Sequence, residues 1–313
     1  MAFSAFYPDA IWLDTDGNPI QAHGGGVLFN GGTYYWYGEN KATPNTHEGR
    51  VEVLGVSCYS SRDLMQWKNE GVVLPAVPDD PAHDLHPSKI AERPKVLYNA
   101  QTKRYVLWLH IDTADYAYAR AGCAVSDSPT GPFRYVGSIA PLNSDSRDMT
   151  VFQDTDGAAY LYFSSDRNQT LKIVRLSDDY LSLTDVYEAA LVGLAREAPA
   201  VFTYGGIYYI ISSACTGWAA NEAQYAVAPS PLGPWNILGN PAEGPGADKT
   251  FESQSAFVLP IANRPGAFIY LGDRWNPENL ADSRYVWLPL AVDGDQISMT
   301  WHDSWDLSVF DSL

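Results

Sequence analysis

The chain has 313 residues, of which 46% are hydrophobic and 18% charged, so it can bury a large core and is not disordered. Its 37 acidic and 20 basic residues give a net charge of −17. A surface this negative repels phosphate groups, which argues against nucleic acid or an anionic membrane as a partner.

The N-terminal residues, Met1 to Ser4, lack the charged start, apolar segment and cleavage site of a secretion signal. No apolar run approaches the ~18 residues that span a bilayer. We therefore expect that the chain stays in the cytoplasm or that a leader has been removed from it. Cys58, Cys123 and Cys215 have no metal-like spacing, which predicts buried thiols rather than a disulfide framework or a zinc site.

One unit recurs along the chain, a turn that usually contains glycine followed by a short aromatic strand. Aromatic and β-branched residues bounded by turn residues are typical of strands. The copies occupy residues 32–37, 103–108, 157–163, 206–211 and 266–271. A turn into an outer strand follows each copy, clearly at 60–67, 126–133 and 229–235 and more loosely at 176–180 and 293–297. Five such units predict an all-β protein, a five-bladed β-propeller that forms a single domain over residues 1–313 without a carbohydrate-binding module.

A polar residue opens each predicted blade, 11 to 14 residues before its aromatic strand. The five residues are His23, Glu92, Asp148, Glu197 and Gln254. Because the innermost strand of each blade lines the propeller axis, we expect these side chains to meet at one rim. Any one of them could be a hydrogen-bonded strand end, but five in register favour a shared polar site.

Three carboxylates in one narrow pocket cannot ionise independently, so their pKa values are pushed apart. This suits general acid–base chemistry, and the leading example is hydrolysis of a glycosidic bond by two carboxyl groups. Sugar rings stack on aromatic side chains, for which the candidates are Trp108, Tyr116, Trp218 and Trp275. Trp108 lies within a predicted strand, where a core position is the better interpretation.

Two short motifs carry a resemblance to a known family. Residues 147–149 with 152–157, and Arg196-Glu197-Ala198-Pro199, resemble segments of glycoside hydrolase family 43, which contains inverting enzymes built on five-bladed propellers. The resemblance covers essentially the whole chain. It implies that Glu197 is the general acid and that Asp148 orients this acid and tunes its pKa.

The chain departs from the family pattern in the first blade. Where most members have an Asp general base, it reads Ala22-His23-Gly24-Gly25-Gly26. Together with residues 34–39, this segment resembles the exo-β-1,3-galactanase subgroup, which lacks that base. The resemblance implies that Gln254, as an amide or its imidic-acid tautomer, positions or deprotonates the attacking water, while Glu92 binds the terminal galactose. Residue chemistry alone favours Glu92 as the base, because an amide is a very poor one, and both assignments stay open here.

The resemblance implies further pocket residues, which are Tyr116, Glu188, Thr216 and Glu39, and Trp218 joins them as a substrate-binding candidate because it could stack on a sugar ring. A solvated loop charge is nearly as good an interpretation of Glu188, and Glu39 is also a candidate partner of His23 or Arg93. A lone histidine is more often structural than a ligand, and the aspartates at 79–80 and 154–156 lack the spacing of a calcium loop. We therefore predict no cofactor and no metal site.

These observations predict an inverting, exo-acting glycoside hydrolase that releases galactose from β-1,3-galactan, such as the backbone of arabinogalactan. One alternative keeps the family and changes the substrate, giving an α-L-arabinofuranosidase or β-xylosidase, against which the missing first-blade Asp counts. The other alternative is a non-catalytic sugar-binding propeller. The pair of Asp148 and Glu197 argues against it, because a binding protein has no need of a tuned proton donor.

Overall fold

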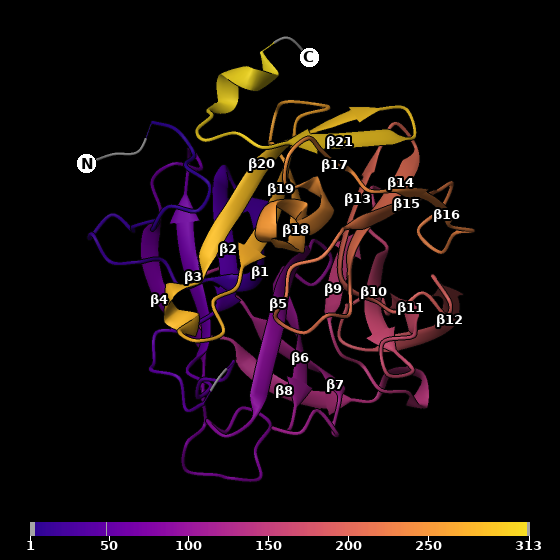
Figure 1. Ribbon diagram of the computed structural model, residues 1–313. Coiled ribbons are helices and arrows are strands. Elements are labelled where there is room, and N and C mark those ends of the chain that lie inside the picture. Colours follow the sequence, from indigo (N-terminus) through magenta and orange to yellow (C-terminus); the bar gives the residue numbers. More distant parts are fainter. Residues whose placement is uncertain (1–3, 48, 312–313) are drawn as a thin grey trace.

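The protein is described by a computed structural model that covers residues 4–47 and 49–311. Its strands form five mainly antiparallel sheets that surround a central axis in chain order, so the fold is the predicted five-bladed β-propeller (Figure 1). The innermost strand of each sheet contacts the innermost strands of both neighbouring sheets, which closes a ring around the axis.

Each blade is built from a continuous stretch of chain. The first blade contains β1 (His23–Asn30), β2 (Thr33–Glu39), β3 (Gly55–Ser61) and β4 (Lys68–Pro75). The second contains β5 (Ile90–Asn99), β6 (Arg104–Asp112), β7 (Arg120–Ser126) and β8 (Arg134–Ile139). The third contains β9 (Met149–Gln153), β10 (Ala159–Ser165), β11 (Thr170–Leu176) and β12 (Leu183–Ala190).

The last two blades follow the same plan, with one addition. The fourth contains β13 (Arg196–Tyr204), β14 (Ile207–Ala214), β15 (Gln224–Ala228) and β16 (Asn236–Gly239). The fifth contains β18 (Gln254–Pro260), β19 (Phe268–Arg274), β20 (Arg284–Asp293) and β21 (Gln296–Thr300), and the short β17 (Ala242–Glu243) pairs with β21 in parallel. The aromatic strands found in the sequence are the second strands of their blades: β2, β6, β10, β14 and β19.

Helical structure is confined to four short 3₁₀ turns in the described part of the chain. They are η1 (Pro141–Asn143), η2 (Ala247–Glu252), η3 (Leu280–Asp282) and η4 (Leu307–Phe310). None of the helices within residues 4–47 and 49–311 is long and apolar enough to cross a membrane.

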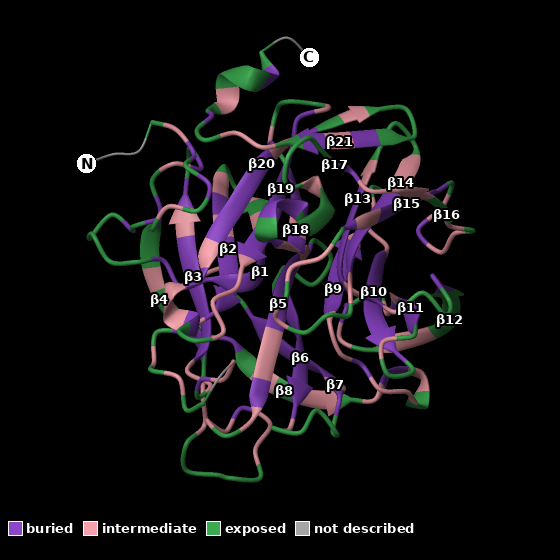
Figure 2. Cartoon of the chain, viewed as in Figure 1, coloured by how far each residue is buried: buried purple, intermediate pink, exposed green. Residues whose placement is uncertain are grey.

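The core fills the spaces between neighbouring blades, and the exposed residues lie mainly in the outer strands and loops (Figure 2). Trp108 is 1% exposed and its indole N–H donates to the Tyr180 carbonyl over 2.9 Å, so its predicted core position is confirmed. The junction of the first and fifth blades holds an aromatic cluster that includes Trp36 and Trp287, and Phe6 and Trp305 form an antiparallel bridge beside it.

A local irregularity recurs at the start of the inner strands. The pairing register shifts between His23 and Gly26 in β1, Glu92 and Lys95 in β5, and Glu197 and Ala200 in β13, and a similar shift follows Ser255 in β18. Gly24, Arg93 and Ala198 have positive φ angles of 56°, 55° and 53° at these points. Such bulges bend a strand and re-aim the side chain beside them, so the fold itself turns the strand-end residues at the rim.

Candidate active site

A pocket of about 490 Å³ lies at the N-terminal ends of the inner strands. Four of the five polar residues predicted to meet there line it, namely Glu92, Asp148, Glu197 and Gln254. They come from four different blades, so the propeller brings together residues that are up to 162 positions apart in the chain. Glu39, at the end of β2, also lines the pocket.

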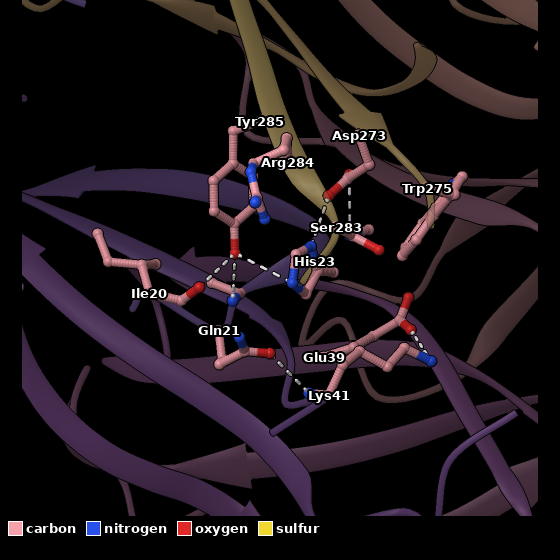
Figure 3. Close-up of polar contacts among 12 residues, drawn as sticks. Ile20, Gln21, His23, Glu39, Lys41, Asp273, Trp275, Ser283, Arg284 and Tyr285 are labelled. Carbon is pink, nitrogen blue, oxygen red and sulfur yellow. Dashed lines mark hydrogen bonds and ion pairs between the residues drawn. The ribbon is translucent and has the colours of Figure 1, made fainter. Parts of the chain in front are cut away.

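His23, the fifth residue, does not line this pocket, which corrects the prediction for that side chain. It is fully buried, its Nδ1 lies 3.1 Å from Asp273 Oδ1, and its ring stacks on Tyr285 (Figure 3). Gly24 follows it at positive φ, where a Cβ would overlap the Glu39 carboxylate. The bulge therefore turns His23 into the junction between the first and fifth blades.

Glu197 has the surroundings of a proton donor. Its Oε1 accepts a hydrogen bond of 3.0 Å from Gln254 Nε2, and its Oε2 accepts one of 3.3 Å from Asn168 Nδ2. Burial and the nearby Asp148 charge raise the pKa of Glu197 to about 7. A carboxyl group with this pKa holds its proton to near-neutral pH, as a general acid must.

Asp148 lies beside Glu197 and is held from two sides. Its Oδ2 accepts a 3.0 Å hydrogen bond from the backbone N–H of Ala198, the residue that follows Glu197. The same oxygen lies 3.1 Å from Arg93 Nη2. Asp148 thus fixes the start of β13 and places a negative charge next to the acid.

Arg93 is a central cation that the sequence analysis did not identify as a site residue. Its backbone N–H donates to Glu39 Oε1 over 2.9 Å, and its Nη1 donates to the Ser255 carbonyl over 2.9 Å. Its Nη2 donates to Gln254 Oε1 as well as pairing with Asp148. The available signal in the sequence was an Arg directly after Glu92, near the start of a predicted inner strand.

Gln254 is hydrogen-bonded at both ends of its amide. Oε1 accepts from Arg93 Nη2 and, over 3.0 Å, from the Trp275 indole. Nε2 donates to Glu197 Oε1 and to Ser213 Oγ, each over 3.0 Å. Guanidinium and indole groups can only donate, so Gln254 Oε1 must keep its lone pairs. This arrangement is that of an ordinary amide, because an imidic acid would place an O–H against two donors.

Glu92 is an ionised carboxylate at the pocket wall. Its Oε1 accepts a 3.2 Å hydrogen bond from the Tyr116 hydroxyl, and its Oε2 lies 3.4 Å from His110 Nδ1. Burial alone would raise the pKa of Glu92, but His110, Lys41 and Arg93 together lower it to about 2. Glu92 therefore carries a negative charge throughout the working range of most enzymes.

Some of the predicted sugar-binding residues line the pocket and others do not. Tyr116, Glu39 and Trp218 line the pocket, and Trp218 packs edge-on against Trp275 with ring centroids 5.5 Å apart. Glu39 also pairs with Lys41 over 2.7 Å (Figure 3), so it acts partly as a support for Arg93 and Lys41.

Two predicted binding residues lie outside the pocket lining. Glu188 is exposed on β12, the outermost strand of its blade, opposite Ile173 of β11. Thr216 is exposed and stabilises its own loop, since its hydroxyl donates to the Ala219 carbonyl over 2.5 Å. Both were carried over from the family resemblance. The register of β12 keeps Glu188 away from the pocket, whereas Thr216 lies in the same loop as the lining residues Gly217 and Trp218.

Cys215 corrects another expectation. Cys58 and Cys123 are buried as predicted, but Cys215 is exposed because it follows the end of β14, beyond the sheet. Its thiol donates to the Ala195 carbonyl over 3.3 Å and lies against Glu197.

Glu92, His110 and Asp148 offer atoms within 4.8 Å of one another, as the ligands of a cation do. The guanidinium of Arg93, 3.1 Å from Asp148, already places a protein cation beside this group. We therefore assign no metal site to it.

Comparison with known proteins agrees with this geometry. Residues 19–242 match the profile of glycosyl hydrolases family 43. The fold is that of a glycoside hydrolase built on a five-bladed β-propeller. The chain belongs to glycosyl hydrolase family 43, as the sequence motifs predicted.

Three relatives illustrate the similarity. A solved family 43 β-1,3-galactosidase has a TM-score of 0.92 and 39% identity, over 99% of this chain and 65% of its own. The exo-β-1,3-galactanase of Phanerochaete chrysosporium, solved with β-1,3-galactotriose, has a TM-score of 0.89 and 37% identity, over 97% of this chain and 68% of its own. A β-D-galactofuranosidase of Aspergillus niger is 27% identical over 201 residues, which are 59% of this chain and 58% of that protein.

Proposed function

We propose that this protein is an inverting, exo-acting hydrolase that releases galactose from β-1,3-galactan. The observation that carries the proposal is Glu197, a carboxyl group with a pKa raised to about 7 that is fixed between Asp148 and Gln254 in an open pocket. The choice of galactan rests on the similarity to enzymes described as acting on β-1,3-linked galactose.

In the proposed reaction, Glu197 donates its proton to the glycosidic oxygen while the bond from this oxygen to C1 of the terminal galactose breaks. A water molecule attacks C1 from the opposite face and loses a proton to a base. The product is α-galactose, and Glu197 regains a proton from solvent. Inversion needs room for this water, with acid and base carboxyl groups roughly 6.5–9.5 Å apart.

We assign the water-activating role to Glu92 rather than to Gln254. Both ends of the Gln254 amide are occupied, and its oxygen faces two groups that can only donate. Glu92 is ionised, and its Oε1 has only the Tyr116 hydroxyl as a hydrogen-bond donor among the described residues. In this assignment, Gln254 holds Glu197 in place and keeps Arg93 aligned with Asp148.

The proposal is tested by incubating the protein with β-1,3-galactan and following the products by NMR. We expect galactose as the main early product, first as its α anomer. Early oligosaccharides would contradict exo action, and β-galactose would contradict inversion. Faster hydrolysis of aryl α-L-arabinofuranosides or β-xylosides would identify the alternative substrates, and tight galactose binding without turnover of any of these would identify a binding protein.

A further inference from the structure

Two buried residues behind Glu92 have no role in the reaction described so far. His110 and Asp112 are both 0% exposed, although each carries a group that costs free energy to bury. They lie at the end of β6, after the run Tyr105 to Leu109, which carries no charged residue. Buried charged groups inside a strand need hydrogen-bond partners or opposite charges, and here one of these partners is Glu92 in the pocket.

The pairing of β5 with β6 places His110 behind the site. Glu92 is directly opposite His110 in the antiparallel register. The imidazole Nδ1 lies 3.4 Å from Glu92 Oε2, and the ring centroid lies 6.1 Å from that of Tyr116. Both side chains that contact the Glu92 carboxylate are therefore held by β6 and the loop that follows it.

Asp112 cannot rotate away from His110. Its Oδ1 accepts hydrogen bonds of 2.8 Å from three backbone N–H groups, those of Thr113, Tyr118 and Ala119. This fixes Oδ2 at 3.0 Å from His110 Nε2. Because a carboxylate accepts, Nε2 carries a proton, and Nδ1 is the atom that faces Glu92.

The other ring nitrogen of His110, Nδ1, is not held by Asp112. It is buried from solvent and has no hydrogen bond of good geometry among the described residues. Burial alone would lower the pKa of His110, but Asp112 and Glu92 raise it to about 9. The ring is thus an imidazolium at neutral pH, and its Nδ1 lies 3.4 Å from Glu92 Oε2, within ion-pair distance of the carboxylate.

We propose that His110 and Asp112 form a positioning pair that keeps Glu92 ionised and aimed at the attacking water. The proposal rests on the function proposed above and on Glu92 as the base. His110 supplies the positive charge and the direction, and Asp112 fixes the orientation of the ring. Neither residue lies at the reacting atoms, so both act through Glu92.

Other charged and titratable groups also face Glu92, and the pair must act against this background. Glu39 ends β2 and Lys41 lies just after it. The others are Arg93 on β5, Tyr116 after β6 and Asp148 before β9. Lys41 is already paired with Glu39 over 2.7 Å, and Arg93 with Asp148 over 3.1 Å. His110 is the cation whose nearest pocket carboxylate is Glu92.

The test is the pH dependence of kcat/KM for galactan in the wild type, His110→Gln and Asp112→Asn. Removing the charge of His110 leaves only Lys41 and Arg93 to oppose the effect of burial, so the pKa of Glu92 should rise toward its ordinary value of about 4.3. The ratio of kcat/KM at pH 4 to that at pH 6 should then fall by up to about threefold. The fall of kcat/KM at alkaline pH, which depends on Glu197, should stay at the same pH.

His23→Gln is the matched control, because His23 is an equally buried histidine paired with a carboxylate at the same rim but outside the pocket lining. It should lower the melting temperature without changing the pH 4 to pH 6 ratio. An equal change of this ratio in His23→Gln would overturn the proposal, since the effect would then be general destabilisation. If His110→Gln does not fold, Asp112→Asn is measured in the same way, with the same expected direction.

A double-mutant comparison gives a second reading. If His110 acts through Glu92, adding His110→Gln to Glu92→Gln should cause little further loss, whereas independent roles would give additive losses. Loss of wild-type activity in EDTA that a divalent cation restores would also overturn the proposal. Failure of the wild type to release galactose would instead reject the proposed function itself.

Discussion

The two ends of the propeller channel differ in chemistry although the same five strands form both. At the start of these strands lie charged and amide side chains, including Glu92, Arg93 and Glu197. Further along the strands, a hollow of about 290 Å³ is lined mainly by apolar residues, such as Val151, Phe202 and Leu259. Lys95 also reaches this hollow, and its ammonium donates to the Gly24 carbonyl over 2.7 Å.

The difference shows how a propeller separates reaction from stability within a single strand. The first residues of the inner strands are displaced by bulges, so their side chains converge on the pocket instead of alternating regularly. Beyond the bulges the pairing is regular, and the side chains pack. Substitutions at the two ends should therefore have separable effects on activity and on folding.

The largest effect on activity is expected from Glu197→Gln. Loss of the proposed proton donor should lower kcat on galactan by about 10⁴-fold. An aryl β-galactoside whose leaving group needs no proton should lose far less, which a side-by-side kinetic assay would show. Equal losses on both substrates would mean that Glu197 is not the acid.

Glu92→Ala should follow, with a loss of about 10²- to 10³-fold from the missing base. Azide is already an anion and needs no deprotonation, so it should restore turnover in this variant and give α-galactosyl azide. Gln254→Ala is the matched control. Azide rescue of Gln254→Ala, and not of Glu92→Ala, would transfer the water-activating role to Gln254.

Gln254→Glu should have a smaller effect that shows mainly in the pH profile. In the wild type, kcat/KM should fall above a pKa of about 7, because Glu197 must be protonated in the proposed reaction. A second carboxylate next to Glu197 Oε1 disfavours its ionisation, so this alkaline limb should move to higher pH. A limb that stays in place or moves to lower pH would contradict the assigned contact.

The smallest effect on activity is expected at the apolar end. Phe202 is 2% exposed and stacks on Tyr209 with centroids 4.6 Å apart. Phe202→Ala should lower the free energy of unfolding by about 3–5 kcal/mol. Activity per folded molecule should stay within about twofold of the wild type, in keeping with the additivity of distant sites. Chemical denaturation and active-site titration with a galactose-like inhibitor would separate the two quantities.

The sequence predicted the propeller because its local pattern repeats. Each aromatic strand carries its own turn signal, and counting back from it located the start of each inner strand. Side-chain direction at these starts was harder to predict, since it depends on the bulges. His23 has the right register but turns toward Asp273, whereas Arg93, next to Glu92, turns toward Gln254.

His110 and Asp112 could have been found from one signal that was not used. They alternate with apolar residues in Leu107-Trp108-Leu109-His110-Ile111-Asp112, where charged side chains are unusual for a buried strand. Their contact with Glu92 depends on the β5–β6 register, which no local motif specifies. Glu188 and Thr216 show the opposite case, because a family resemblance suggested them without a register argument.

Within residues 4–47 and 49–311, the five sheets form a ring without a strand shared between its first and last blades. The ends of the ring are joined by side-chain contacts and short bridges, such as Phe6 with Trp305 and the Tyr285 hydroxyl with the backbone of Ala22. The ring should therefore open first at this junction. Glu39 of the first blade and Gln254 of the fifth blade lie on its two sides. Mild heating should therefore abolish the activity of the enzyme at a temperature where its far-ultraviolet circular dichroism spectrum is still that of a β protein.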